Sequence, residues 1–279
     1  MKELTLSEIK QLELDMLIDF TSFCDKNQYT YWLGGGTLLG AIRHKGFIPW
    51  DDDIDIMMPR DDYEQAIKNY KNDRFKIDSI LLDDRSWIRY AKLNDTNTVL
   101  KSNYKSSCKE SVFIDIFPIE GLPDSNFKRK FMYSVEKILI GGVLSSIMTY
   151  TASNRYKDRD AGFLNWRFYS RTVLKYLFVT CLGKIPPYFW ARKSDSFAKK
   201  YPFYKSKMVG CLISGVHGTK EIMPYKIFSD KIEVDFEGRK FWGLKYYDFY
   251  LSRLYGDYMK LPPKEKQQTH HDFSAYWRE

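Results

Sequence analysis

The fold of this chain is decided by the stretch from Trp32 to Asp62, which reads WLGGGTLLGAIRHKGFIPWDDDIDIMMPRDD. A short aromatic run, Tyr29 to Leu33, favours a strand that ends at the three glycines of positions 34–36. The residues from Thr37 to Arg43 then favour a short helix, and the apolar run from Ile54 to Met58 predicts a second strand. The order strand, glycine turn, helix, strand indicates an α/β or α+β fold.

The glycine turn is a predicted phosphate-binding element. Glycines let the backbone turn tightly with its N–H groups bare, and the following helix points its positive end at the same place. We therefore expect Gly35, Gly36 and Thr37 to contact the phosphate of a substrate, with a plain structural turn as the alternative. Arg43 and Lys45 come at the end of the helix, where they either neutralise diphosphate charge or balance the helix dipole.

Carboxylates crowd the start of the second strand. Strand alternation puts Asp51, Asp53 and Asp55 on one face and turns Ile54 and Ile56 toward the core. Three like charges so placed repel strongly unless they are protonated or bridged by cations. Because ligands that are all oxygen atoms select a hard cation, the pattern predicts a site for Mg²⁺ or Mn²⁺.

Asp115 supplies a further carboxylate from the predicted strand Val112 to Phe117. An acid in an otherwise apolar strand is costly to bury without a cation or a hydrogen-bonding partner, so a metal ligand is predicted, with a structural acid as the alternative. Arg89 and Lys92, on a strand of the same half, are candidates for phosphate contact. The glycine turn, the Asp-x-Asp strand and the lone aspartate together predict a two-metal phosphoryl-transfer site.

The remaining elements follow from periodicity and turn residues. Ser7 is expected to cap an N-terminal helix that runs to about Lys26. The other predicted elements are a helix at Asp61–Tyr70, strands at Arg74–Leu82 and Trp87–Leu93, a hairpin at Lys231–Lys245 around Glu237-Gly238, and a helix at about Tyr246–Tyr255.

Composition describes a globular protein. The chain has 279 residues, of which 44% are hydrophobic and 17% aromatic, and these values exclude a disordered, collagenous or coiled-coil chain. Its four cysteines lie far apart without a CxxC pair, which argues against a disulfide framework and a zinc ribbon and fits a reducing compartment. The first twenty residues contain no apolar signal-peptide core, so we expect a cytoplasmic location.

The positive charge belongs to one segment. The formal charge is +8, but residues 126–208 hold 17 Lys/Arg against 4 Asp/Glu, whereas the rest of the chain holds 27 against 32. We expect residues 1–125 and 209–279 to form one catalytic body, and residues 126–208 to form a basic, mostly helical insertion. No Gly/Ser-rich or Pro-rich linker separates the parts.

The insertion is expected to meet an anionic partner. The uncharged run from Ile138 to Asn154 is too short and too rich in small polar residues to span a bilayer, which favours a buried or interfacial helix. The segment from Trp166 to Trp190 combines basic and aromatic residues, as helices on anionic membrane surfaces do. Peripheral contact with the inner face of the plasma membrane, or with an anionic acceptor, is the expectation.

The stretch from Trp32 to Asp62 closely resembles the LicD family, the phosphocholine-transferase relatives that include the fukutin-related proteins. The family's typical pattern, Gly-Gly-Thr-Leu-Leu-Gly-Ala-x-Arg-His and then Gly-Phe-Ile-Pro-Trp-Asp-Asp-Asp-Ile-Asp, is complete in this chain. The resemblance continues at FIDIFP, residues 113–118, and at YGDYMKLPP, residues 255–263, with His270 and His271 after it. It covers the N-terminal half and the C-terminal part of the chain.

The resemblance implies a nucleotidyltransferase-like mixed sheet flanked by helices, with Asp53, Asp55 and Asp115 as the catalytic metal triad. Asp51 is expected to be an additional ligand. Members of the family move a phosphoryl-linked alcohol such as phosphocholine from a CDP-activated donor to a sugar hydroxyl of a surface glycan. Acceptors of this class are teichoic acid, lipopolysaccharide and capsule precursors, and no nucleic-acid partner is expected.

We expect the sugar hydroxyl to attack the phosphorus in line while CMP leaves, with two cations bridged by Asp53 and Asp55. Asp115 completes one metal site and can take the hydroxyl proton. Two other classes stay open at this stage. A DxD glycosyltransferase also uses a metal-bound nucleotide diphosphate, and a non-catalytic binder would dock the basic segment on an anionic glycan or membrane.

Overall fold

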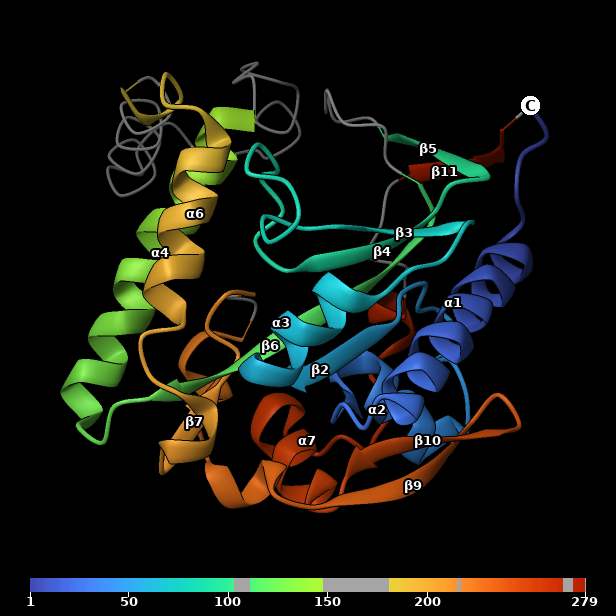
Figure 1. Cartoon of the computed structure of the whole chain (residues 1–279). Coiled ribbons are helices and arrows are strands. Elements are labelled where there is room, and N and C mark those ends of the chain that lie inside the picture. The colour runs from blue at the N-terminus through green and yellow to red at the C-terminus, as the bar shows by residue number, and fades with distance from the viewer. Residues whose placement is uncertain (103–110, 148–180, 215–216, 268–272, 279) are drawn as a thin grey trace, which may run out of the picture.

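The structure, a computed structural model, describes residues 1–102, 111–147, 181–214, 217–267 and 273–278 (Figure 1). Within these ranges a mixed sheet of seven strands forms the centre of the molecule. Its main path runs through β1 (Trp32–Leu33), β2 (Asp55–Pro59), β6 (Phe113–Leu122), β4 (Ala91–Asp95) and β3 (Phe75–Asp78), while β7 (Met208–Gly210) pairs with β6 and with β8 (Met223–Pro224). Strands β2 and β6 are parallel, and the other pairs of this sheet are antiparallel.

Helices flank this sheet, which confirms the predicted fold class. The described α-helices are α1 (Leu6–Lys26), α2 (Gly35–His44), α3 (Arg60–Asn69), α4 (Asn126–Ile147), α6 (Pro187–Ala198) and α7 (Tyr247–Tyr255). Helices α1 and α3 both pack against β6, whereas α2 packs against β2 and α7. Helices α4 and α6 pack against each other at one side of the molecule (Figure 1).

The start of α1 corrects one expectation. Thr5, not Ser7, is the N-cap, because its hydroxyl accepts from the Glu8 N–H while the Glu8 carboxylate accepts from the Thr5 N–H. This reciprocal capping box satisfies two N–H groups at once, which a cap at Ser7 would leave open. The helix then buries an apolar stripe that includes Ile9, Leu12, Met16, Leu17, Phe20 and Cys24.

Several strands begin or end at other residues than predicted. The strand predicted from Tyr29 forms only at Trp32–Leu33, because the Thr30 N–H donates to the Asp62 carboxylate at 3.0 Å instead of to a neighbouring strand. The strand predicted to end at Leu82 ends at Asp78, where a turn begins. Strand β6 runs past its predicted end to Leu122, because its second half pairs with β7.

The predicted hairpin is confirmed as β9 (Lys231–Phe236) and β10 (Arg239–Leu244). Its turn residues, Glu237 and Gly238, have φ angles of 49° and 72°, as a two-residue hairpin turn with both centres in the left-handed region requires. The hairpin packs beside β1 and α2. β5 (Thr98–Ser102) and β11 (Phe273–Trp277) form a second pair of strands. Glu3 bridges to Tyr276 of β11, so the segment near residue 3 lies beside the segment near residue 276.

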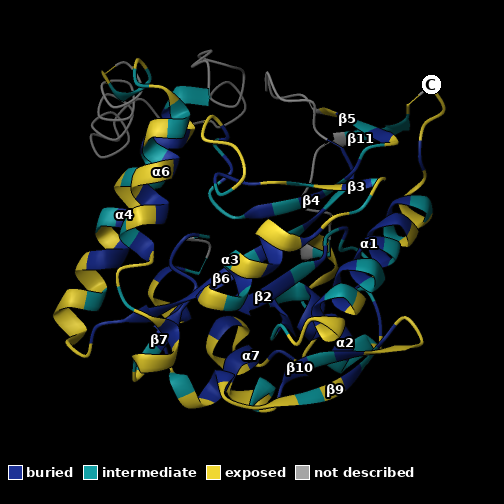
Figure 2. Ribbon diagram, in the orientation of Figure 1, coloured by how far each residue is buried: buried dark blue, intermediate teal, exposed yellow. Residues whose placement is uncertain are grey.

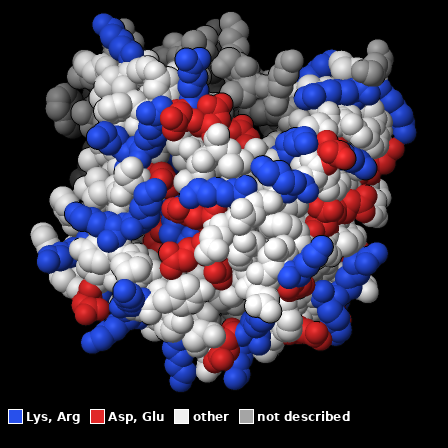
Figure 3. Space-filling view, viewed as in Figure 1, with Lys and Arg blue, Asp and Glu red and all other residues white. Residues whose placement is uncertain are grey.

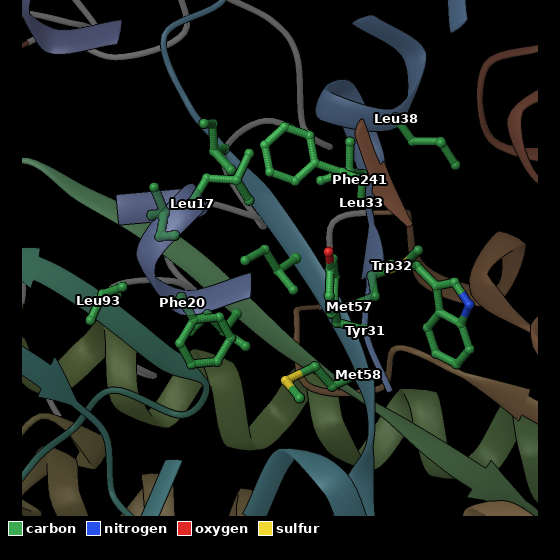
Figure 4. Packing of buried hydrophobic residues seen from close by; sticks show 14 of the residues in the cluster. Leu17, Phe20, Tyr31, Trp32, Leu33, Leu38, Met57, Met58, Leu93 and Phe241 are labelled. Carbon is green, nitrogen blue, oxygen red and sulfur yellow. The ribbon is translucent and has the colours of Figure 1, made fainter. Parts of the chain in front are cut away.

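The main core lies between the central sheet, α1, α2 and the hairpin. Figure 4 shows part of it, with Phe20 from α1, Trp32 and Leu33 from β1, and Phe241 from β10 gathered around β2. Figure 2 shows the same pattern as buried inner and exposed outer faces. The helix pair α4 and α6 contributes to two smaller apolar clusters instead.

A buried ion network ties α6 to the sheet. The Arg60 guanidinium, 4% exposed at the start of α3, donates to Glu120 of β6 and to Asp195 of α6, the latter at 2.9 Å. Both acceptors are buried, so each charge depends on the others for compensation. The network joins the predicted insertion to the predicted catalytic body. Most of the segment predicted from Trp166 to Trp190 lies outside the described residues. Among the described helices, none combines the length and the apolar character needed to cross a bilayer.

Candidate active site

The glycine turn touches the carboxylates directly. Gly35 has a φ of +44°, and a Cβ on it would lie 2.5 Å from Oδ2 of Asp55. A Cβ on Gly36 would lie 2.7 Å from Oδ2 of Asp51. A Cβ at either position would therefore displace a carboxylate oxygen, and at Gly35 the left-handed backbone conformation also favours glycine. The positive end of α2 faces the acidic cluster.

The expectation that the N–H groups of the turn are bare is wrong for two of them. The Gly34 N–H donates to the carbonyl of Asp55 at 2.9 Å, and the Gly35 N–H donates to the hydroxyl of Tyr250 at 3.3 Å. The N–H groups of Gly36 and Thr37 form no hydrogen bond within the described part of the chain. The first turn of α2 therefore still offers two donors to a bound anion.

Three neighbouring strands bring three predicted residues into one row. Asp55 on β2 lies beside Asp115 on β6 in the parallel register, and Lys92 on β4 lies opposite Asp115. The Lys92 ammonium is 3.1 Å from Oδ1 of Asp115 and covers the ring of Phe113. The two aspartates thus share one face of the sheet, with a positive charge at one end of the row.

Thr37 holds Asp55 in place. Its hydroxyl, 3% exposed, accepts from the N–H of Asp55 at 2.8 Å. The phosphate contact predicted for Thr37 is therefore left to its backbone N–H, while its side chain fixes the start of β2. The bond joins the first turn of α2 to the Asp-x-Asp segment.

Asp51 and Asp53 precede β2 and are not part of it, because the ladder begins at Asp55. The predicted alternation nevertheless persists in the side chains. Asp51, Asp53 and Asp55 are half-buried, while Asp52 and Ile54 between them are buried. The extended backbone thus presents the three half-buried acids to one side.

Burial and mutual repulsion raise the pKa values of two carboxyl groups in this cluster. Burial raises the pKa of Asp55 well above its usual range, and the charges of Asp53, Asp115 and Asp51 add to the increase while Lys92 opposes it. Burial and the charges of Asp53 and Asp52 raise the pKa of Asp51 to about 7. The cluster therefore carries more negative charge than its protein surroundings balance.

Three residues that sequence reasoning missed complete the surroundings. Glu13 of α1 is 2% exposed, and burial, with the charges of Asp53 and Asp52, raises its pKa well above its usual range. The Tyr255 hydroxyl would lie 3.7 Å from a Cβ on Gly35, and its ring meets His217 edge to face. Tyr250 binds the glycine turn itself. An acid inside the apolar stripe of α1 was the visible signal for Glu13, and Tyr255 begins the stretch YGDYMKLPP that shares the family resemblance. No local pattern connects Tyr250 with the turn.

Other predicted site residues lie elsewhere. Arg43 donates to the carbonyl of Tyr258 at 2.6 Å, and Lys45 is exposed beyond the last turn of α2, at the end opposite the acids. Arg89 donates to the carbonyl of Ile213 and lies 3.9 Å from Glu136 of α4. Their phosphate contacts stay predictions. His270 and His271 lie outside the described residues.

The acids fit a hard cation by their chemistry. As the side chains stand, no group of three or more His, Cys, Asp or Glu residues in the described ranges is arranged to hold a metal ion. The donor set is nevertheless made of carboxylates alone, which suits Mg²⁺ or Mn²⁺. The raised pKa values of Asp51 and Asp55 report the uncompensated charge that a divalent cation would neutralise.

The chain is similar in sequence to several known proteins. The model of the LicD/FKTN/FKRP nucleotidyltransferase domain matches residues 28–139. The lipopolysaccharide cholinephosphotransferase LicD of Haemophilus influenzae is 34% identical over 286 residues, which cover 99% of each chain. An uncharacterized protein of Rickettsia typhi is 40% identical over 80 residues, 27% of this chain and 26% of its own. The human ribitol 5-phosphate transferase FKRP is 38% identical over 58 residues, 21% of this chain and 11% of its own.

Proposed function

Because this chain belongs to the LicD family and is a phosphotransferase, we propose that it moves phosphocholine from CDP-choline to a sugar hydroxyl of a cell-surface glycan. The glycan class includes teichoic acid, lipopolysaccharide and capsule precursors, and we place the reaction in the cytoplasm. The H. influenzae relative, named for cholinephosphate transfer to lipopolysaccharide, supports both the donor alcohol and the acceptor class. The FKRP relatives, named for ribitol 5-phosphate transfer, support other phosphoryl-linked alcohols as the next donors to test.

The observation that carries the proposal is the row Asp55, Asp115 and Lys92 across β2, β6 and β4, set against the glycine turn. The first turn of α2, which carries the anion donors, lies directly beside the Asp51 and Asp55 carboxylates. A substrate that is anionic and metal-bound needs both kinds of group at once. A diphosphate donor has this chemistry.

In the proposed reaction, Asp53, Asp55 and Asp115 would hold the cations, with Asp51 as a further ligand. Bound Mg²⁺ or Mn²⁺ would neutralise charge on the diphosphate and acidify the attacking hydroxyl. The N–H groups of Gly36 and Thr37 donate to a donor phosphate oxygen. The sugar oxygen forms the new bond to phosphorus, the bond from phosphorus to the CMP oxygen breaks, and the Asp115 carboxylate receives the hydroxyl proton.

Two cationic side chains have different parts in this reaction. Lys92 balances the charge of Asp115 and, in the proposed reaction, would donate to an equatorial phosphate oxygen. Arg43 ties the C-terminal end of α2 to the segment after α7 through the Tyr258 carbonyl, so it supports the position of the helix.

The test is CMP release by the purified protein with Mg²⁺. A panel of CDP-alcohols, CDP-choline first, is offered with and without glycan acceptors, and nucleotide sugars form a second panel. CMP release that depends on a CDP-alcohol supports the proposal. Release of nucleotide from a nucleotide sugar alone would favour the DxD glycosyltransferase class, and release from no CDP-alcohol under any condition would refute the phosphotransfer proposal.

Matched variants make the test specific. Asp53→Asn and Asp55→Asn keep the side-chain shape but remove a ligand charge, so we expect CMP release to fall by roughly 10³-fold or more. Asp73→Asn, an exposed aspartate before β3, is the control and should retain full activity. Full activity in either site variant would contradict the assignment of the acids. Mg²⁺ should raise the melting temperature of the unchanged protein and of Asp73→Asn, but much less that of Asp55→Asn.

A further inference from the structure

The first four turns of α4 carry an apolar stripe that faces solvent. Phe127 is 79% exposed, Phe131 57% and Ile138 54%. Their spacing of four and seven residues puts them on one side of the helix, opposite the buried residues Met132 and Glu136. With a rise of about 1.5 Å per residue, the stripe is roughly 16 Å long.

All exposed charges on α4 and α6 are basic. The acids of the two helices are buried: Glu136 of α4 lies against Ser194, and Asp195 of α6 binds Arg60. The lysines of α4 at positions 128, 130 and 137 are exposed, as are Arg192 and Lys193 of α6. In Figure 3, Lys and Arg side chains predominate along the left edge of the molecule, where Figure 1 places these helices.

We propose that this side of α4 binds an anionic phospholipid surface, with the helix lying in the plane of the membrane. The outer face of α4 is defined by its apolar stripe and its flanking lysines: Phe127, Phe131, Ile138, Lys128, Lys130 and Lys137. The aromatic and aliphatic side chains enter the boundary between headgroups and acyl chains, and the lysines meet lipid phosphates.

Charge complementarity selects the lipid surface over other occupants. A second copy of this chain would bring the same basic face, and like charges would oppose such a dimer. A soluble polyanion would satisfy the lysines but would leave three large apolar side chains in water. An anionic bilayer satisfies both sets of residues at the same time.

The proposal rests on the proposed function only for its purpose, since an acceptor carried on a lipid would be met at such a surface. Binding itself needs neither donor nor acceptor. It is therefore measured by flotation of the full chain with vesicles of phosphatidylcholine, alone or mixed with phosphatidylglycerol. We expect flotation with the mixed vesicles only, weakening as the ionic strength rises.

Two variants divide the outer face of α4 into its parts. Lys128→Glu/Lys130→Glu/Lys137→Glu should weaken binding by a hundredfold or more, because each lysine near an anionic surface contributes about fivefold. Phe127→Ser/Phe131→Ser/Ile138→Ser should leave a residual binding that high salt abolishes. The matched control, Lys71→Glu/Lys260→Glu/Lys264→Glu, changes the net charge equally at three exposed lysines elsewhere and should bind the mixed vesicles nearly as well as the unchanged chain.

Several outcomes would overturn the proposal. Failure of the unchanged chain to float at low salt is one, and equal loss of binding in the control is another. If the unchanged chain forms a dimer in solution and the triple serine variant is a monomer, the outer face of α4 binds a second copy of this chain instead. If the serine variant does not fold, as judged by its thermal unfolding, Phe127→Ser alone decides the apolar part. CMP release without vesicles should be the same in all variants, so its loss would bear on the reaction and not on this surface.

Discussion

The substitution Gly36→Ala tests whether the glycine is needed for the stability of α2 or for the arrangement of the site. Gly36 lies in the first turn of the helix, and a Cβ there would stand 2.7 Å from Oδ2 of Asp51. This contact involves the end of a side chain, which can move, and not the backbone. The change Gly36→Ala should therefore fold, but with Asp51 displaced from the acidic cluster.

We expect Gly36→Ala to leave the stability unchanged or raise it, but to lower the rate of CMP release. Alanine is more favourable than glycine inside a helix by about 1 kcal/mol, so the free energy of unfolding should stay unchanged or rise. The Asp51 carboxylate must move by roughly half an ångström to 1 Å, and misplacement of a site group by about 1 Å can cost up to about 100-fold in rate. We expect CMP release to fall by about 10- to 100-fold.

Gly40→Ala in the same helix is the control. A Cβ on Gly40 would stand 2.5 Å from the carbonyl oxygen of Gly46 and 3.4 Å from the N atom of Ile48, both of which are backbone. Because this backbone cannot rotate away, we expect a loss of about 1–3 kcal/mol in the free energy of unfolding. Denaturant unfolding and CMP release, measured on both variants, give the comparison.

The reasoning is refuted if Gly36→Ala releases CMP as fast as the unchanged protein, because the Asp51 position would then not matter for the reaction. It is also refuted if Gly36→Ala loses as much stability as Gly40→Ala. In that case the glycine would be required by the fold, and the contact with the carboxylate would be incidental.

Three further predictions concern Arg60, Glu221 and Tyr255. Arg60→Met leaves two buried carboxylates without their cation and should lower the free energy of unfolding by about 3–5 kcal/mol in denaturant titrations, whereas Lys68→Met, in an exposed pair, should change it by less than about 0.5 kcal/mol. Burial raises the pKa of Glu221 to about 8, so the folded protein keeps a proton on Glu221 that the unfolded chain releases near pH 4.5. The contribution of this proton to the free energy of unfolding is complete below pH 4.5 and is lost as the pH rises to about 8, by up to about 1.4 kcal/mol per pH unit. Glu221→Gln should remove this slope. Tyr255→Phe removes the hydroxyl beside the glycine turn and should lower CMP release with little change in melting temperature, and unchanged release would contradict a role for this hydroxyl in the site.

Local sequence accounts for much of the fold. The helix α2, the apolar strand β2 and the hairpin around Glu237-Gly238 formed within two residues of the predicted positions, although α2 begins at Gly35, inside the predicted glycine turn. Each depends on backbone preferences or on a hydrophobic period within a few residues. The cap of α1 was misplaced by two residues, because the reciprocal bond between Thr5 and Glu8 outweighed the simpler pattern at Ser7.

The candidate site was predicted in its chemistry but not in its assembly. Residue type and strand alternation selected Asp51, Asp53, Asp55 and Asp115, because clustered or buried acids need a partner. The resemblance to the LicD family then selected Asp53, Asp55 and Asp115 as the metal triad. The hydrogen bond of Arg43 to Tyr258, the contact of Arg89 with Ile213 and the buried position of Glu13 depend on segments far away in the chain. No local pattern contains that information.

The amino-acid sequence alone thus determined which groups are present and in what order: a glycine turn, a run of carboxylates, a lone acid and a basic segment. Tertiary structure alone decided that Asp115 lies beside Asp55 and that Lys92 pairs with Asp115. It also decided that the Tyr250 hydroxyl accepts from the glycine turn and that Phe127 faces solvent. Strand register and helix orientation are set by the burial of all elements together, a property of the whole chain that no single segment encodes.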